Sequence, residues 1–186
     1  MKDYPILFSG PMVRALLSGA KTETRRLASS PLARRAAGDR MWVREDWRTL
    51  HKWDAISPRN LIDDRTKVTY MADPENANPL WAFGRRRASM HMPRWACRLE
   101  LTVTAVRIQA LQSITPEEAE REGIVSDTDR GGLLFYHLPG VPEIQRSANP
   151  VDCYAQLWDM LHPDEGQRFR DNPDIVALTF SVENTR

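Results

Sequence analysis

A lysine and a threonine three residues apart, Lys21 and Thr24, are the pair in this sequence best suited to covalent chemistry. They lie in a basic run, Lys21–Arg26, that follows Gly19 almost directly. In a strand their side chains would point to opposite faces, whereas a turn would let them share one side. A lysine with a lowered pKa could then take the hydroxyl proton of Thr24 and make it a nucleophile. The local pattern alone favours the alternative, a solvated basic turn that closes the preceding helix.

Glu122 is a carboxylate that could join this pair. It lies in the last turn of a predicted helix, just before Gly123, where its negative charge opposes the helix dipole. It also follows Glu118 by four residues, a like-charge spacing that costs roughly a few tenths of a kcal/mol. A tertiary partner such as Lys21 would offset these costs. The alternative, which the local sequence favours, is an exposed glutamate on a strongly acidic helix.

Several common catalytic and binding motifs are missing from the sequence. The histidines are far apart, and none lies at metal-ligand spacing from a cysteine: His51, His91, His137 and His162. No glycine-rich phosphate-binding loop and no Gly-x-Ser-x-Gly elbow is present. We therefore expect no metal and no cofactor, and a common nucleotide-dependent or serine-hydrolase mechanism has no support.

Charge is distributed unevenly along the chain, although the net charge is only +1. Residues 1–107 carry 20 Lys and Arg against 11 Asp and Glu, whereas residues 108–186 carry 6 against 14. The basic half also holds five of the six tryptophans, Trp42, Trp47, Trp53, Trp81 and Trp95. Arginine combined with aromatic side chains suits RNA or a nucleobase as the partner. The alternative is a GC-rich genome, which favours arginine codons, together with ordinary core tryptophans.

Three helices are expected to position these residues. The first begins near Gly10-Pro11 and stops at Gly19. The second begins with Thr115 as N-cap, followed by Pro116 and a capping-box glutamate, and ends at Gly123. The third opens at Asn149-Pro150, and its apolar stripe is expected in the core: Tyr154, Leu157, Trp158 and Leu161.

Short strands are predicted between these helices. Residues 99–105 give the clearest one, because apolar and polar side chains alternate there. The other predicted strands lie near residues 6–8, 41–45, 68–70 and 175–182. Residues 48–66 show little periodicity, and residues 125–148 resemble a surface insertion. Short strands with a few flanking helices predict an α+β barrel.

Length and composition indicate one globular domain over residues 1–186. No apolar run approaches the length of a membrane span, and no apolar segment follows the N-terminus as in a signal peptide. Cys97 and Cys153 are too few for a disulfide scaffold. We therefore expect a cytoplasmic protein that does not enter a membrane; its oligomeric state is not predicted.

The sequence resembles the ASCH family of the PUA-like superfamily. The resemblance is carried by Ser18–Arg26, which is similar to the family's Gly-x-Lys-x-x-Thr-x-Arg signature after its first helix. It continues through Gly38–Val43, Val103–Val106 and the Glu118–Ile124 helix. Trp42–Trp47 and the segment around Arg94 look like a longer subgroup often met in phages and prophages. The resemblance implies a PUA-like β-barrel with flanking helices.

The resemblance also implies a site. Small bacterial ASCH proteins include amidohydrolases that deacylate N4-acetylcytidine with a lysine, a threonine and a glutamate, which fall on Lys21, Thr24 and Glu122. By this analogy Thr24 attacks the amide, Lys21 is its base and Glu122 orients it or relays protons. Other ASCH proteins are ribonucleases on single-stranded RNA, or only bind RNA. The residues expected to contact the nucleoside or RNA are Arg25, Arg26, Trp42, Arg44 and Arg94.

This chain departs from the small hydrolases in length. It has insertions at about 48–95 and 125–148, and Arg44 replaces a small residue. These differences bear on the substrate more than on the place of the site. Three hypotheses follow: a hydrolase of an N4-acylated cytidine-like substrate, a metal-independent ribonuclease, and a non-catalytic RNA-binding module.

Overall fold

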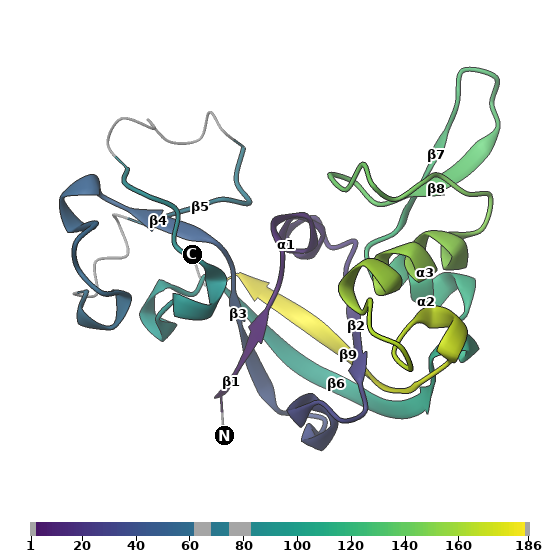
Figure 1. Cartoon of the computed structure of the whole chain (residues 1–186), viewed down its shortest axis with the longest axis horizontal. Coiled ribbons are helices and arrows are strands. Elements are labelled where there is room, and N and C mark those ends of the chain that lie inside the picture. Colours follow the sequence, from purple (N-terminus) through teal and green to yellow (C-terminus); the bar gives the residue numbers. More distant parts are fainter. Residues whose placement is uncertain (1–2, 62–67, 75–82, 185–186) are drawn as a thin grey trace. The chain divides into compact units, whose positions relative to one another are not determined.

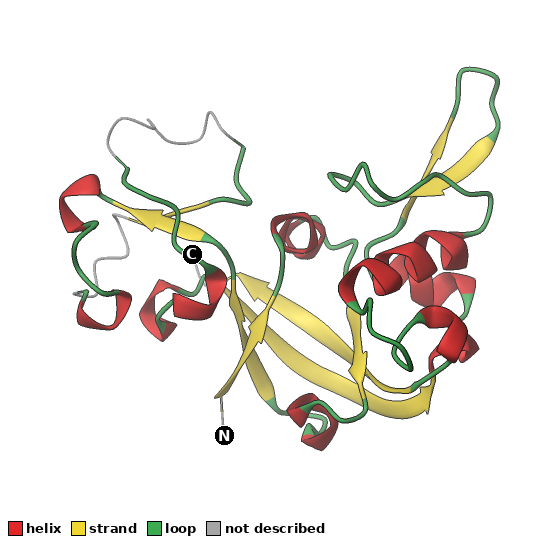
Figure 2. Cartoon of the chain, in the orientation of Figure 1, coloured by secondary structure: helices red, strands yellow, loops and turns green. Residues whose placement is uncertain are grey.

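The computed structural model describes residues 3–61, 68–74 and 83–184. Within these residues the chain forms nine β-strands and three α-helices, connected by loops and short 3₁₀ helices (Figure 2). The fold is therefore of the α+β class, as the sequence predicts. In this part of the chain, no helix has the length and apolar character needed to cross a membrane.

Five strands form the main sheet, in the order β1-β3-β6-β9-β2 (Figure 1). Strand β1 (Asp3–Leu7) runs parallel to β3 (Arg40–Arg44). Strand β2 (Glu23–Leu27) runs antiparallel to β9 (Asp174–Asn184), and β6 (Leu99–Ala110) is the central strand. The described strands form no closed barrel, so the structure supports the α+β class and leaves the barrel as a prediction.

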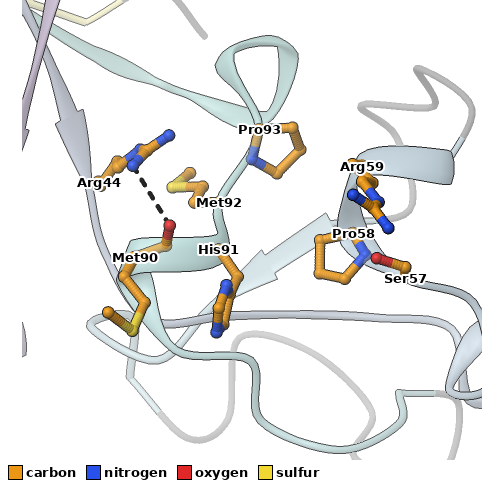
Figure 3. A pocket seen from close by; sticks show the side chains of 8 residues that line it. All are labelled: Arg44, Ser57, Pro58, Arg59, Met90, His91, Met92 and Pro93. Carbon is orange, nitrogen blue, oxygen red and sulfur yellow. Dashed lines mark hydrogen bonds between the residues drawn. The ribbon is translucent and has the colours of Figure 1, made fainter.

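The chain divides into two compact units, a division that does not test the prediction of a single domain. The first unit comprises Met1–Arg14, Arg40–Leu101 and Val182–Arg186. It contains the antiparallel strands β4 (Trp47–Thr49) and β5 (Val68–Tyr70), most of which fall in the predicted insertion at 48–95. A pocket of about 420 Å³ lies in this unit (Figure 3). The hydrophobic core of this unit includes a buried cluster of Trp47, Leu61, Tyr70, Met92 and Ala96.

The second unit comprises Ala15–Asp39 and Thr102–Ser181. Strand β2 lies in it, together with the two helices α2 (Pro116–Arg121) and α3 (Pro150–Leu161), which contact each other. Helix α1 (Gly10–Leu17) begins in the first unit and ends in the second. The predicted insertion at 125–148 contains a hairpin of two antiparallel strands, β7 (Val125–Thr128) and β8 (Leu134–His137).

Each predicted helix is present, and the expected residues cap two of them. At the start of α2, Thr115 Oγ1 accepts a hydrogen bond from the N–H of Glu118, whose carboxylate accepts one from the N–H of Thr115. At the start of α3, the Asn149 side chain accepts a hydrogen bond from the N–H of Val151. The predicted core stripe of α3 was wrong at one position. Leu161 is 57% exposed because the helix ends there, whereas its other members, Tyr154, Leu157 and Trp158, are buried.

Strand β6 departs from the predicted alternation. Leu99 and Leu101 are buried as expected, but Glu100 between them is buried too. Glu100 forms ion pairs with Arg40 and Arg94, so a neutralised carboxylate occupies the face expected to be exposed. A period-two pattern identifies the apolar face of a strand, but it does not show that arginines cover the other face.

Gly123 makes the turn that ends α2 and leads back toward β2. Its φ is +105°, in a region that favours glycine. A Cβ added there would lie 3.1 Å from the Cβ of Ala15 and 3.7 Å from the Cβ of Lys21. The turn therefore requires glycine both for its backbone angle and for the space beside it. It follows Glu122, which forms an isolated β-bridge with Lys21.

We expect Gly123→Ala to lower the free energy of unfolding by about 1–3 kcal/mol, since left-handed backbone alone costs about 1–2 kcal/mol for a residue with a side chain. Gly132→Ala is the matched control, because Gly132 has a φ of +81° but nothing within 4 Å of an added Cβ. Urea unfolding of both variants measures the difference. Equal losses would show that the contact with Ala15 has no energetic consequence.

Candidate functional site

Strand β2 presents two different surfaces, because successive side chains alternate across a strand. Glu23 and Arg25 lie on one side and form an ion pair, with Arg25 Nη2 2.6 Å from Glu23 Oε1. Thr24 and Arg26 lie on the other side, where Arg26 Nη1 donates a hydrogen bond of 2.8 Å to Thr24 Oγ1. The basic run therefore leads into a strand with an ionic face and a hydroxyl-bearing face. Neither the solvated turn that the local pattern favours nor a turn that would bring Lys21 and Thr24 to one side is present.

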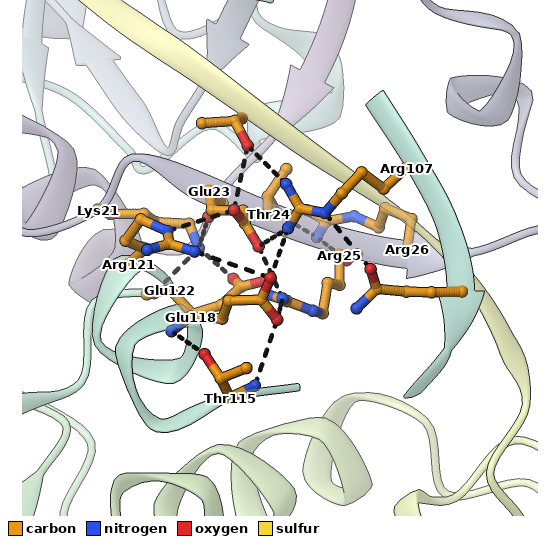
Figure 4. A network of polar contacts seen from close by, with 12 residues as sticks. Lys21, Glu23, Thr24, Arg25, Arg26, Arg107, Thr115, Glu118, Arg121 and Glu122 are labelled. Carbon is orange, nitrogen blue, oxygen red and sulfur yellow. Dashed lines mark hydrogen bonds and ion pairs between the residues drawn. The ribbon is translucent and has the colours of Figure 1, made fainter. Parts of the chain in front are cut away.

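Lys21 precedes this strand, and its ammonium group is buried against Glu122. Lys21 Nζ lies 2.6 Å from Glu122 Oε2 and donates to the backbone carbonyls of Glu23 and Glu122 at 2.9 and 3.0 Å (Figure 4). Only 1% of Lys21 and 3% of Glu122 is exposed. Burial lowers the pKa of Lys21 and outweighs the charge of Glu122, which raises it. The tertiary partner expected for a carboxylate at this helix end is therefore Lys21.

Further buried ions surround Glu122 beside α2 (Figure 4). The Arg25 guanidinium lies 2.6 Å from Glu23, 2.7 Å from Glu118 and 3.2 Å from Glu122. Arg107 Nη2 lies 2.9 Å from Glu23 and 2.7 Å from Glu118. Arg25, predicted to contact a nucleoside or RNA, is 1% exposed and belongs to this network.

Thr24 has no exposed surface, and its hydroxyl accepts a hydrogen bond from the guanidinium of Arg26. Arg26 is half-buried, and its Nη1 also donates to the backbone carbonyl of Arg25 at 2.7 Å. Burial lowers the pKa of Arg26, against the opposing charge of Glu122. A cationic donor at Thr24 Oγ1 stabilises negative charge on that oxygen. The structure thus brings Lys21 and Glu122 into contact and joins Thr24 to Arg26.

Tyr154 of α3 belongs to the same cluster, although the sequence indicated only a core residue. Its ring centre lies 5.8 Å from Cζ of Arg25. Burial and the charge of Glu122 raise the pKa of Tyr154 well above its usual value, so the hydroxyl keeps its proton. An apolar helical stripe gives no sign of such a position. Arg107 was missed for a similar reason, since it continues a strand pattern, whereas the capping box had already singled out Glu118.

Three other predicted binding residues, Trp42, Arg44 and Arg94, lie in the first unit. Both arginines lie near the ring of Trp42. Cζ of Arg44 is 4.5 Å from the ring centre, and Cζ of Arg94 is 5.7 Å from it. Arg94 also pairs with Asp3 and Glu100, which neutralise its charge. The predicted catalytic residues all lie in the second unit. The predicted site residues therefore fall into two groups, one in each unit.

Comparison with known proteins assigns no family to the chain. No family model matches it, and no curated protein matches it either. A solved structure, protein EF3133 from Enterococcus faecalis V583, of the family model DUF984, is similar at a TM-score of 0.46 and 10% identity. The match covers 99% of this chain and 82% of that one. A likeness at this level assigns neither fold nor function.

The ionic face of β2 should make the fold sensitive to acid through Glu23. Burial raises the pKa of this carboxyl group, but the charges of Arg25 and Arg107 outweigh burial and hold the pKa below its usual value. Such a group stabilises the fold above the pKa of the unfolded chain. Its contribution is lost as the pH falls through the lower pKa of the folded chain.

We therefore expect the free energy of unfolding to fall as the pH is lowered from about 5 toward 3. Glu23→Gln should lower stability at pH 7 and flatten this part of the profile, since no carboxyl remains there to be protonated. Urea unfolding at a series of pH values measures both effects. Glu165→Gln is the matched control, because Glu165 is exposed. A Glu23→Gln profile parallel to that of the unsubstituted protein would contradict the prediction.

Proposed function

We propose that the protein is a hydrolase that cleaves the amide bond of an N4-acylated cytidine or a similar modified nucleoside, with Thr24 as the nucleophile. We also propose that its sheet is of the PUA-like barrel type found in the ASCH family. The observation that carries the activity is the buried Lys21–Glu122 pair, placed directly before the strand on which Arg26 holds the Thr24 hydroxyl. A lysine whose pKa is lowered by burial, and which lies beside a specific charged partner, is a candidate for an active-site residue.

In the proposed reaction Lys21 acts in its neutral form, which burial favours. Lys21 accepts the hydroxyl proton of Thr24, through one bridging water because the two side chains lie on different sides of β2, as the oxygen attacks the acyl carbonyl carbon. The tetrahedral intermediate expels the N4 nitrogen of the base, which receives that proton from Lys21. Water then hydrolyses the acyl ester of Thr24, with Lys21 accepting a proton from water and returning it to the threonine oxygen. The products are cytidine and a carboxylic acid.

Glu122 and Arg26 support this chemistry as positioning residues. Glu122 Oε2 lies 2.6 Å from Lys21 Nζ, so it fixes the amine and can hold the proton that leaves it. Arg26 donates to Thr24 Oγ1 and stabilises the charge that develops on this oxygen. Because Thr24 and Lys21 are both buried, a covering side chain has to move before substrate reaches the hydroxyl.

The proposal is tested by incubating the protein with N4-acetylcytidine in the presence of EDTA. Mass spectrometry then measures the formation of cytidine and acetate. We expect Thr24→Val to lose at least about 1000-fold in rate, because it keeps the branched shape of the side chain but removes the nucleophilic oxygen. Thr24→Ser, which retains a hydroxyl, is the matched control and should keep measurable turnover. The melting temperature of each variant shows whether the fold is intact.

Single-stranded RNA is incubated in parallel, because a ribonuclease is the alternative prediction. Undiminished turnover by folded Thr24→Val would overturn the role of this residue. Cleavage of RNA with no deacylation would identify a ribonuclease instead, and an absence of product from both substrates would contradict a hydrolase of either kind.

A further inference from the structure

Among the residues that the structure describes, the pocket in the first unit is lined by cationic, polar and apolar groups and by no carboxylate. Its volume of about 420 Å³ falls within the range of small-molecule sites, roughly 300–1,000 Å³. Figure 3 shows Arg44 and Arg59 on opposite sides of it, with methionine, histidine and proline side chains between them. Its lining consists of Arg44, Ser57, Pro58, Arg59, Met90, His91, Met92 and Pro93.

Arg44 is held in place without a neutralising partner in the described part of the chain. Its guanidinium stacks on Trp42, with Cζ 4.5 Å from the ring centre, and its Nη1 donates to the carbonyl of Met90 at 3.2 Å. Its Nε is buried and has no hydrogen-bond partner among the described residues. Burial lowers the pKa of Arg44. A desolvated cation with an unused donor is costly unless a ligand supplies the missing negative charge.

Several other arginines of this unit have carboxylate partners. Arg98 makes a two-point contact with Glu45, at 2.8 and 2.9 Å, and also pairs with Asp73. Arg86 and Arg94 likewise have carboxylate partners. Buried Arg87 instead donates to the backbone carbonyls of Trp53 and Ile56. Arg44 differs from Arg87 because it lines a pocket.

The opposite side of the pocket adds a second cation and polar groups. Arg59 is exposed on a 3₁₀ helix (Pro58–Asn60), and the hydroxyl of Ser57 precedes it. His91 offers an imidazole at the rim. The apolar surface in the lining comes from Pro58, Pro93 and the exposed side chain of Met90. Guanidinium groups recognise phosphate with a planar pair of donors, and an apolar wall suits a flat base.

We propose that this pocket binds a nucleoside monophosphate unit, either as a free nucleotide or as the phosphorylated end of a single-stranded RNA. The phosphate contacts one of the two arginines, and the base packs on the wall between them. This site is separate from Thr24 and its chemistry. It stands whether or not the protein is a hydrolase, because no residue of the Lys21–Glu122 cluster lines the pocket.

Isothermal titration of the full chain with adenosine monophosphate, with adenosine and with inorganic phosphate tests the proposal. We expect the monophosphate to bind at least about tenfold more tightly than adenosine, since each lost charge-assisted contact costs about one tenfold step or more. At least one of Arg59→Gln and Arg44→Lys should weaken binding of the monophosphate by about tenfold. Arg59 is exposed, so its substitution should leave the fold intact. Arg130→Gln removes an exposed arginine outside the pocket and is the matched control. Arg44→Lys tests the other side of the pocket.

The outcomes separate the possible results. Tighter binding of a 5′-phosphorylated tetra-adenylate than of the monophosphate identifies an RNA end as the source, and equal binding identifies a free nucleotide. The proposal is overturned if no phosphate compound binds, if adenosine binds as tightly as its monophosphate, or if Arg59→Gln and Arg44→Lys bind like Arg130→Gln. Thr24→Val is titrated as well, and its unchanged affinity separates this pocket from the proposed hydrolase site.

Discussion

Glu122 is the residue on which the second unit most depends. Its backbone bridges Lys21, one carboxylate oxygen contacts Lys21 Nζ, and the other contacts Arg25. Burying an ion costs roughly several kcal/mol unless oppositely charged partners lie beside it. Loss of Glu122 would therefore remove a compensating charge from buried Lys21 and Arg25. The end of α2 is thereby tied to the start of β2 by charge, and the turn at Gly123 makes this approach possible.

Successive side chains of β2 point to opposite sides of the strand, so one side holds the ion pairs and the other holds the Thr24 hydroxyl. The side that carries Arg25 faces carboxylates of β2 and α2, and those contacts hold the strand to the helix. The side that carries Thr24 and Arg26 has a hydroxyl with a single cationic donor. Four adjacent residues of mixed charge can therefore serve both purposes, because a strand directs neighbours to opposite faces. Lys21 lies just before the strand, and its contact with Glu122 is on the side of Arg25.

Arginine is used in two ways in this protein. Most of the buried or half-buried guanidinium groups have carboxylate partners, as Arg25, Arg98 and Arg107 do, and these pairs link segments far apart in the sequence. Arg44 instead stacks on Trp42 and keeps a donor without a partner among the described residues. Arginines paired with carboxylates stabilise the fold, whereas Arg44 lines a pocket and points to a ligand. Composition alone cannot separate the two uses.

The sequence by itself determined the α+β class, the three helices and most of the strands, because caps and periodicity act over a few neighbouring residues. It also showed that a distant partner would stabilise Glu122 at the end of its helix, although the local sequence favoured an exposed glutamate. Tertiary structure decided what local pattern cannot express: that Glu100 is buried by arginines, that Arg25 is enclosed by carboxylates, and that Tyr154 lies beside that guanidinium. Each of these depends on which segments meet across the fold, and side-chain periodicity carries no information about the partner on the other side.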